Sequence, residues 1–369
     1  MKQGKEGANV TPRERSIRAM RSPSQTRKEL PDRVPVVPLI DTSYAARLYG
    51  IPISKGFLSP EEHAKALIAC LEQHCHIDGL SINLCLSESV ILDITEEGDT
   101  LRVKTVGGVT WEVPYDDIGT PVEREIVSFD DERLHLDDPF RAGIVDTLRN
   151  FPRDILSNYL INVGLTGPYS QVVFLMGLER VMTGLIDDPD GVIRAIEARV
   201  PFTLNWAKEL ADLGAPCIWI GEGLASSTLI SPQMYKEFVL PYEEKVVSYI
   251  HSLGLPCIIH ICGNATPILE LIAQSGADCL ELDWQVDIGH AKKAIGNSMC
   301  LKGNLNTTLL VSGRPEEIYR EANKCILAAA EGGGFILSSG CAVGRDTPRE
   351  NVDAMIKATI EHSYEDKSV

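Results

Sequence analysis

The sequence has no long hydrophobic run, and its positively charged residues are outnumbered by negatively charged ones. No stretch of eighteen apolar residues occurs, and the first sixteen residues, MKQGKEGANVTPRERS, lack the apolar core of a signal peptide. We therefore expect a cytoplasmic protein that does not enter the membrane. Lys and Arg total 35 against 52 Asp and Glu, which gives a net charge of −17. This balance argues against nucleic-acid binding, for which a basic surface is typical, and favours a small ligand or one carried by another protein.

The sequence also lacks closely paired cysteines. Its ten cysteines are dispersed, and no two have the Cys-x-x-Cys spacing of a zinc ribbon. They do not form the dense pattern of a secreted disulfide scaffold either. Several lie inside apolar runs, where cysteine packs as a small hydrophobic residue, so one or two are left as candidate ligands. The cysteines are residues 70, 75, 85, 217, 257, 262, 279, 300, 325 and 341.

Composition and periodicity together predict the fold. An apolar share of 44% and a charged share of 24% are typical of a globular protein, and 369 residues suffice for two ordinary domains or one large α/β barrel. Residues 31–369 contain eight short runs of β-forming residues, and most segments between them have the amphipathic pattern of helices. This alternation predicts a single (β/α)8 TIM barrel of the α/β class. The predicted strands are residues 33–40, 79–86, 159–166, 215–222, 255–262, 277–284, 298–305 and 333–340.

Two segments lie outside this alternation. Residues 1–30 are polar and basic and are predicted to form an arm that leads into a short helix, PRERSIRAMR. Residues 87–115 have period-two apolar spacing with Glu-Gly-Asp and Gly-Gly turns, which predicts a β-hairpin inserted after the second strand. Loops that follow barrel strands lie on the catalytic face, so the hairpin is expected to help roof a site.

Reactive side chains lie at the ends of four predicted strands. In a parallel barrel these ends converge on one pocket, so the residues there are functional candidates by position. A spacing of two, as between His260 and Cys262, places both side chains on the same face of a strand. The candidates are Glu222 on the fourth strand, His260 and Cys262 on the fifth, Glu281 and Asp283 on the sixth, and Cys341 just past the eighth.

His260, Cys262 and Cys341 offer one imidazole and two thiolates, to which an acid would add an oxygen donor. Such a set forms a tetrahedral zinc site, which is catalytic when three protein ligands leave an exchangeable fourth position. The cysteines are far apart in the sequence, so the folded barrel would assemble the site. A histidine at the end of an apolar strand can instead be a packed core residue, and the residues alone leave both interpretations open.

Three segments carry a family resemblance: HICGNATPILELIAQSGADCLELDW, LKGNLNTTLLVSGRPEEI and SSGCAVGRDTPRENVDAM. They resemble the uroporphyrinogen decarboxylase superfamily, and more closely its branch of zinc-dependent methylcobamide:thiol methyltransferases. The resemblance extends to PDRVPVVPLID, GLTGPYSQVVFLMGLERVM and ISPQMYKEFVLPY. It implies that His260, Cys262 and Cys341 bind Zn²⁺. It further implies that Asp283 holds the fourth position until substrate arrives, with Glu281 as the alternative.

The resemblance implies that a methyl group moves from methylcob(III)alamin to a small thiol, which zinc converts to a thiolate. The chain has no Asp-x-His-x-x-Gly corrinoid-binding signature, so a separate corrinoid protein is the expected carrier of the methylcobalamin. Asn264 and Trp284 are the candidates for contact with the corrin, and Glu222 and Glu281 for contact with the substrate. Arg345 is the candidate anchor for an acid group.

The identity of the thiol stays open, with coenzyme M and homocysteine as the candidates. Both carry an acid group that an arginine would bind, but the coenzyme M enzymes do not have arginine at the position of Arg345. This departure speaks against coenzyme M. The sequence does not define the oligomeric state.

Other activities are compatible with the same barrel. A methyl ether or methylamine could be demethylated to methylate a corrinoid protein, although two thiolate ligands favour the thiol reaction. A uroporphyrinogen decarboxylase-like activity is another alternative, but the arginine-rich N-terminal segment of those enzymes has no counterpart in PVVPLIDTSYAARLYG. A non-enzymatic adaptor with a structural zinc is the last.

Overall fold

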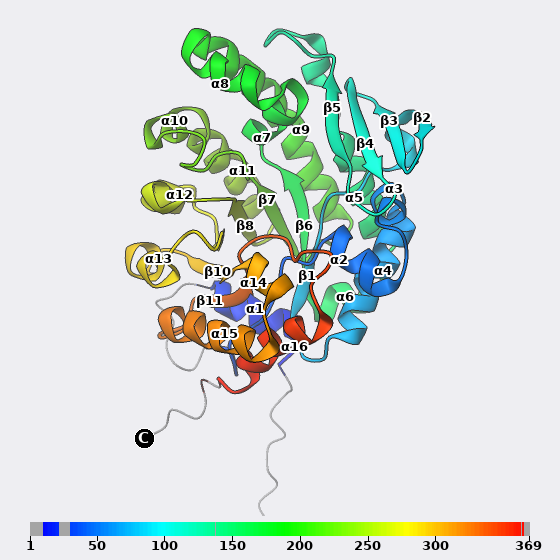
Figure 1. Cartoon of the computed structure of the whole chain (residues 1–369). Coiled ribbons are helices and arrows are strands. Elements are labelled where there is room, and N and C mark those ends of the chain that lie inside the picture. Colours follow the sequence, from blue (N-terminus) through cyan, green and yellow to red (C-terminus); the bar gives the residue numbers. More distant parts are fainter. Residues whose placement is uncertain (1–9, 22–29, 137, 363, 365–369) are drawn as a thin grey trace, which may run out of the picture.

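The computed structural model describes residues 10–21, 30–136, 138–362 and 364. Its centre is a sheet of seven parallel strands in the order β1, β6, β7, β8, β9, β10, β11, and helices surround this sheet (Figure 1). Each strand lies within one of the predicted runs, so the α/β class and the parallel sheet are confirmed. The strands are β1 (Gly79–Ile82), β6 (Leu160–Thr166), β7 (Cys217–Gly221), β8 (Cys257–Ile261), β9 (Cys279–Leu282), β10 (Cys300–Leu305) and β11 (Phe335–Ser339).

The prediction of a regular strand at residues 33–40 is wrong. The segment contains two prolines, which have no N–H to donate to a strand ladder, and it forms no regular strand; Val36 pairs with Leu337 in an isolated parallel bridge. The N–H of Val37 donates to the carbonyl of Leu337 at 2.9 Å, and the N–H of Asp78 donates to the carbonyl of Val36 at 2.8 Å. The segment therefore bonds to both edges of the seven-stranded sheet, at β11 and just before β1.

A buried carboxylate holds this junction together. Asp78 is fully buried and accepts hydrogen bonds from Arg15 Nη1 at 2.6 Å, Arg33 Nη1 at 2.8 Å and the N–H of Val36 at 2.8 Å. Arg15 belongs to helix α1 (Pro12–Met20), which lies within the predicted N-terminal helix. Residues 1–9 of the predicted arm lie outside the described residues. The two guanidinium groups compensate the buried charge and tie the N-terminal helix to the sheet.

Most of the helices connect successive strands of the central sheet. Ser59 caps the helix that follows it, because its hydroxyl accepts a hydrogen bond from the N–H of Glu62 at 3.4 Å. The helices after α1 are α2 (Thr42–Tyr49), α3 (Ile53–Leu58), α4 (Pro60–Gln73), α5 (Pro139–Arg149), α6 (Arg153–Asn158), α7 (Pro168–Met176), α8 (Leu178–Asp187), α9 (Pro189–Asp212), α10 (Pro232–Phe238), α11 (Leu240–Ser252), α12 (Leu269–Gln274), α13 (Ile288–Ile295), α14 (Thr307–Ser312), α15 (Pro315–Ala329) and α16 (Arg349–Ile360), and the short 3-10 helices are Glu88–Val90, Glu132–His135 and Thr266–Ile268.

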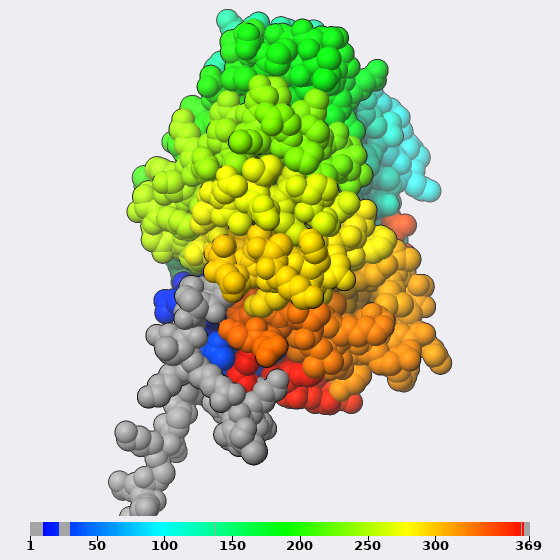
Figure 2. All heavy atoms as spheres, turned by 90° about the vertical axis from the view of Figure 1, so that its left-hand side faces the viewer, coloured from blue at the N-terminus to red at the C-terminus, as the bar shows by residue number. Residues whose placement is uncertain are grey.

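Helices form a continuous outer layer on one side of the molecule. Figure 1 places α8, α10, α12, α13 and α15 on this side from top to bottom, and Figure 2 shows the same segments touching one another, from green through yellow to orange. In the part of the chain that the structure describes, no helix combines the length and the apolar character needed to cross a membrane.

The inserted segment forms more than a hairpin. Four antiparallel strands, β2 (Ile91–Glu97), β3 (Thr100–Thr105), β4 (Val109–Pro114) and β5 (Thr120–Arg124), pair in sequence order, so the sheet continues past residue 115. The strand β5 reads Thr-Pro-Val-Glu-Arg, which has no apolar alternation to predict it. One face is buried through Trp111, whose ring meets that of Phe140 at 5.1 Å and 71°, so the inserted sheet packs on α5.

Replacing Asp78 by Ala should destabilise the protein. The substitution leaves two largely buried arginines without their shared partner, and breaking a buried ion pair in this way costs about 3–5 kcal/mol. Chemical denaturation followed by circular dichroism measures the loss. Asp93→Ala on the exposed strand β2 is the matched control, for which a change within about 0.5 kcal/mol is expected. Equal stability of the two variants would contradict the structural role of Asp78.

Candidate metal centre

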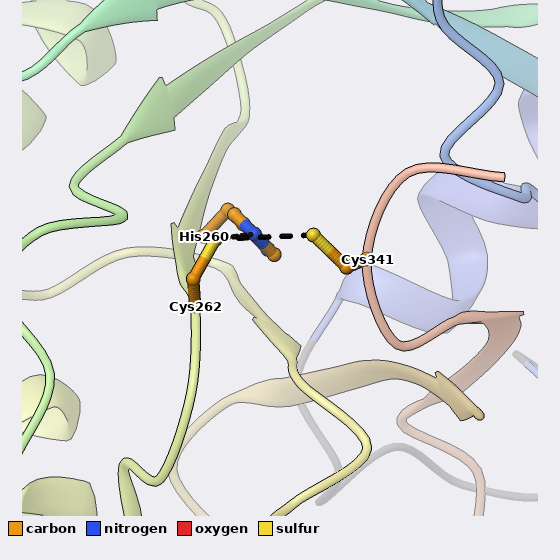
Figure 3. A group of neighbouring side chains, drawn as sticks. All are labelled: His260, Cys262 and Cys341. Carbon is orange, nitrogen blue, oxygen red and sulfur yellow. Dashed lines mark hydrogen bonds between the residues drawn. The ribbon is translucent and has the colours of Figure 1, made fainter. Parts of the chain in front are cut away.

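Three predicted ligands lie together where β8 and β11 end. His260 is in β8, Cys262 follows directly after that strand, and Cys341 lies just past β11 and points toward the other two from the opposite side (Figure 3). Nε2 of His260 lies 3.0 Å from Sγ of Cys262, and this sulfur lies 3.9 Å from Sγ of Cys341. One ligand atom from each residue lies within 4.8 Å of the others. The fold thus joins residues that are 79 positions apart in the sequence.

Glycines let the chain approach itself closely around this group. Gly263 follows Cys262 with φ of +77°, a left-handed conformation that turns the chain away from the strand. A Cβ on Gly340 would lie 2.5 Å from the backbone nitrogen of Trp284, so any larger residue before Cys341 would push β11 away from the end of β9. The positions of both cysteines therefore depend on a neighbouring glycine.

His260 is held from behind by a buried carboxylate. Oε2 of Glu281 lies 3.3 Å from Nδ1 of His260 and accepts a hydrogen bond from Nε1 of Trp219 at 2.6 Å. The other oxygen pairs with Lys302, and both charged side chains are completely buried. The indole of Trp219 stacks on the imidazole with ring centroids 5.4 Å apart and 20° between the planes. These contacts fix the ring so that Nε2 faces Cys262, as carboxylates do for metal-binding histidines.

The protonation of the group follows from its short contacts. A hydrogen bond from Cys262, together with His260, lowers the pKa of Cys341 to about 5. The same hydrogen bond and burial raise the pKa of Cys262. Burial opposes the charged form of Glu281, but Lys302 and His260 outweigh it and lower its pKa to about 2. The site therefore stabilises a thiolate next to hydrogen-bond donors, an environment in which a cation can replace the shared protons.

The donor set fits zinc. One imidazole nitrogen and two thiol sulfurs, converging within 4.8 Å, are ligands that Zn²⁺ prefers, and three protein ligands leave one tetrahedral position open. The buried Glu281 supplies the outer contact to the imidazole that such histidines require. The chemistry and placement of the three residues agree with the sequence-based expectation of a zinc site.

Asp283 and Glu222 are not among the described residues whose ligand atoms converge with His260. Asp283 is buried and its Oδ1 accepts a hydrogen bond from the N–H of Gln285 at 2.9 Å, which caps the turn after β9. Glu222 is also buried and accepts hydrogen bonds from the N–H of Ser170 at 3.0 Å and from its hydroxyl at 2.6 Å. Burial raises the pKa of Glu222 to about 7. Its contacts are those of a carboxylate that caps the N-terminus of α7.

The other predicted contact residues lie in loops around the site. Nη1 of Arg345 donates to the carbonyl of Asp116 at 2.6 Å and lies 2.8 Å from Oδ2 of Asp117, so this side chain is joined to the loop between β4 and β5. Asn264 stabilises its own turn, since its Oδ1 accepts a hydrogen bond from the N–H of Thr266 at 3.0 Å. The side chain of Trp284 remains 44% exposed.

A cavity of about 320 Å³ opens beside the three ligands. Most of the residues that line the cavity were not predicted from the sequence. Two polar ones, however, directly follow predicted or observed strands, the positions at which functional residues are expected. Asp41 follows the run 33–40, and Asn83 follows β1. The lining residues are Leu39, Asp41, Asn83, Leu84, Phe140, Ile144, Gly164, Leu165, Thr166, Ser170, Phe174, Trp219, Gly221, Gly223, Leu224, His260, Cys262, Cys341 and Ala342.

The fold and the site define an α/β protein whose parallel strands end on a His-Cys-Cys ligand group. Residues 97–362 match the uroporphyrinogen decarboxylase (URO-D) family, and the chain belongs to this family. A "Methylated-thiol--coenzyme M methyltransferase" of Methanosarcina mazei is 33% identical over 60% of this chain and 58% of its own length. A "Methylcobamide:CoM methyltransferase MtbA" of the same organism is 27% identical over 96% of this chain and 99% of its own length.

A uroporphyrinogen decarboxylase of Carboxydothermus hydrogenoformans is also similar, at 28% identity over 56% of each chain. Among solved structures, a "methyltransferase from Methanosarcina mazei" superposes with a TM-score of 0.78 and 22% identity over 96% of this chain and 99% of the other. At this identity the likeness establishes the fold and no more.

Removing either cysteine ligand should abolish zinc binding. Protein loaded with zinc is expected to hold about one ion per chain, and Cys262→Ala and Cys341→Ala should each reduce this to background because two protein ligands do not hold the ion. Metal analysis after gel filtration measures the content. Cys75→Ala, at an exposed cysteine, is the control and should retain zinc. Retention of zinc by Cys262→Ala would overturn the ligand assignment.

Glu281→Gln should weaken zinc binding without removing a ligand. Loss of an outer carboxylate contact costs about 10–100-fold in metal affinity, which competition with a chelating dye measures. The variant should also unfold more easily, because Lys302 loses its buried partner. Glu270→Gln, on the exposed side of α12, should change neither quantity. Unchanged zinc affinity in Glu281→Gln would show that the carboxylate does not support His260.

Proposed function

We propose that this protein is a zinc-dependent methyltransferase that moves a methyl group from a methylated corrinoid to a thiol. The observation that carries the proposal is the convergence of one imidazole and two thiols within 4.8 Å at the mouth of a cavity. This set leaves one coordination position, and the cavity gives a small molecule access to it. The relatives named methylcobamide:CoM methyltransferases support the same reaction class.

The residues of the chain have separate roles in this proposal. His260, Cys262 and Cys341 hold the metal, and Glu281 with Trp219 keeps the imidazole in position. When bound, zinc would supply the positive charge that lowers the pKa of a substrate thiol into the neutral range. We assign the open position to this thiol. The apolar side chains around the cavity exclude water, so the thiolate sulfur stays weakly solvated and nucleophilic.

The reaction is a displacement at the methyl carbon. The new sulfur–carbon bond forms as the cobalt–carbon bond breaks, both electrons of that bond remain on cobalt as cob(I)alamin, and the thiol proton leaves to solvent. The cavity of about 320 Å³ is far too small for a corrin ring, so the methyl group must be presented from outside. We therefore infer that a separate corrinoid protein docks over the site and that the inserted sheet β2–β5 contributes to its docking surface.

The decarboxylase alternative is not favoured by the cavity. A polycarboxylated tetrapyrrole requires several cations around it, and the described residues that line the cavity include no Lys or Arg. Among the described lining residues, Asp41 is the one ionisable side chain besides the three ligands. The same lining gives no anchor for several carboxylates.

The test is a methyl-transfer assay with free methylcobalamin. Zinc-loaded protein is incubated with methylcobalamin and a panel of thiols, and visible spectra are recorded for the appearance of cob(I)alamin or cob(II)alamin. We expect turnover with at least one thiol, reduction to background in Cys341→Ala, and full activity in Cys75→Ala. A protein that holds stoichiometric zinc but methylates none of the thiols would contradict the proposal.

A further inference from the structure

The cavity beside the ligand group is lined largely by apolar side chains. They come from segments far apart in the sequence, so that a mostly hydrocarbon surface surrounds the open side of the site. Trp219 adds its indole face next to His260. The aliphatic and aromatic members are Leu39, Leu84, Phe140, Ile144, Leu165, Phe174 and Leu224.

One of these side chains is kept in place by an unfavourable backbone. Leu84 has φ of +44°, a left-handed conformation that costs a non-glycine residue on the order of 1 kcal/mol. Its carbonyl accepts a hydrogen bond from the hydroxyl of Thr42 at 2.9 Å, which stabilises this conformation. A large apolar residue at a position where glycine or asparagine is usual presents a hydrocarbon surface to the cavity.

No positive charge faces the cavity from the described residues that line it. Two cationic side chains from the neighbouring segments are paired elsewhere. Lys302 is fully buried against Glu281, and Arg345 is paired with Asp117 in the inserted segment and does not line the cavity. A sulfonate or carboxylate that entered would lose its water without gaining a counter-ion, which is strongly unfavourable.

The polar groups of the cavity are suited to hydrogen-bond donors rather than to anions. Asp41 is buried at the N-terminus of α2, where its Oδ1 accepts a hydrogen bond from the N–H of Ser43 at 3.0 Å. The side-chain oxygen of Asn83 is buried and has no hydrogen-bond partner among the described residues. Together with the two cysteine sulfurs, these oxygens make the surroundings electron-rich, which disfavours a second negative charge on the ligand.

We propose that the thiol methylated at this site is uncharged and largely apolar beyond its sulfur atom, and that anionic thiols such as coenzyme M (2-mercaptoethanesulfonate) are poor substrates. The inference rests on the proposed function, since it names the substrate class of the same reaction. A cavity of about 320 Å³ has the volume of roughly ten water-sized groups, enough for a thiol with a short aliphatic or aromatic body. The specificity follows from Leu84, Asn83 and Asp41.

The first experiment compares thiols with similar chain lengths and different head groups. The values of kcat/KM with methylcobalamin are measured for 1-propanethiol, 2-mercaptoethanol and 2-mercaptoethanesulfonate. We expect 1-propanethiol to exceed the sulfonate by at least about tenfold, with 2-mercaptoethanol on the side of the uncharged thiol. Equal or better use of the sulfonate would overturn the inference and leave the methyltransferase function intact.

The second experiment changes the protein and keeps the same two thiols, so that differences in the acidity of the thiols do not affect the comparison. Asn83→Lys places a cation where a polar side chain already faces the cavity, so it should shift the ratio of the two kcat/KM values toward the sulfonate by about tenfold or more. Asn150→Lys makes the same exchange at the exposed C-terminus of α5 and should leave the ratio unchanged. An unchanged ratio in a folded Asn83→Lys protein would contradict the assignment of the cavity.

Binding of the product thioethers gives a measurement that does not require methyl transfer. Calorimetric titration of the protein with methyl propyl sulfide and with 2-(methylthio)ethanesulfonate should detect the first and a binding constant at least tenfold weaker for the second. If no thiol is methylated but this preference is found, the proposed reaction fails and the class of ligand stands. Tighter binding of the sulfonate would overturn the inference by itself.

Discussion

The buried carboxylate of Glu281 is the contact on which the rest of the site depends. It reaches side chains on four neighbouring strands: Trp219 on β7, His260 on β8, Lys302 on β10 and Ser338 on β11. A charge at this depth is tolerated because Lys302 neutralises it and because N–H and O–H donors surround its oxygens. The arrangement fixes the relative positions of the strands whose ends carry the ligands. The position of His260 in the candidate metal centre is therefore set by the sheet interior, whereas the two cysteines lie in the loops directly after their strands.

Polar and apolar surroundings lie on opposite sides of His260. Behind the imidazole, Glu281 forms a buried ion pair with Lys302 and lies 3.3 Å from Nδ1 of His260. In front of it, the cavity is mostly hydrocarbon and contains no cation from the described lining residues. The first environment orients a ligand and tunes its basicity, and the second determines which molecules can approach. We propose that a centre built this way binds its metal through the fold and selects its substrate by charge.

The sequence predicted most of the fold because buried parallel strands read as continuous apolar runs, which are easy to recognise. The prediction failed where a segment either contains prolines or lacks the apolar residues of such a run. The prolines of residues 33–40 prevent a regular strand although the segment still bonds to Leu337 and Asp78, and β5 has too few apolar residues to be seen. Among the site residues, spacing identified His260 and Cys262, and the strand scheme together with the family resemblance added Cys341. Asp283 was chosen from its place at the end of the sixth predicted strand and from the family resemblance, whereas Arg345 was chosen because it is close to Cys341 in the sequence. In the structure Asp283 accepts a hydrogen bond from Gln285, and Arg345 pairs with Asp117 of the inserted segment.

The sequence by itself determined the strand-and-helix alternation and the residue types that can bind zinc, because both depend on local patterns within a few positions. Only the tertiary structure decided which of the candidate acids stands behind His260, and that the cavity has no positive charge. These properties arise from residues such as Asp41, Phe174, Glu281 and Cys341, which come together through the pairing of distant strands. No local pattern records such contacts, since each depends on where the whole chain places the partner.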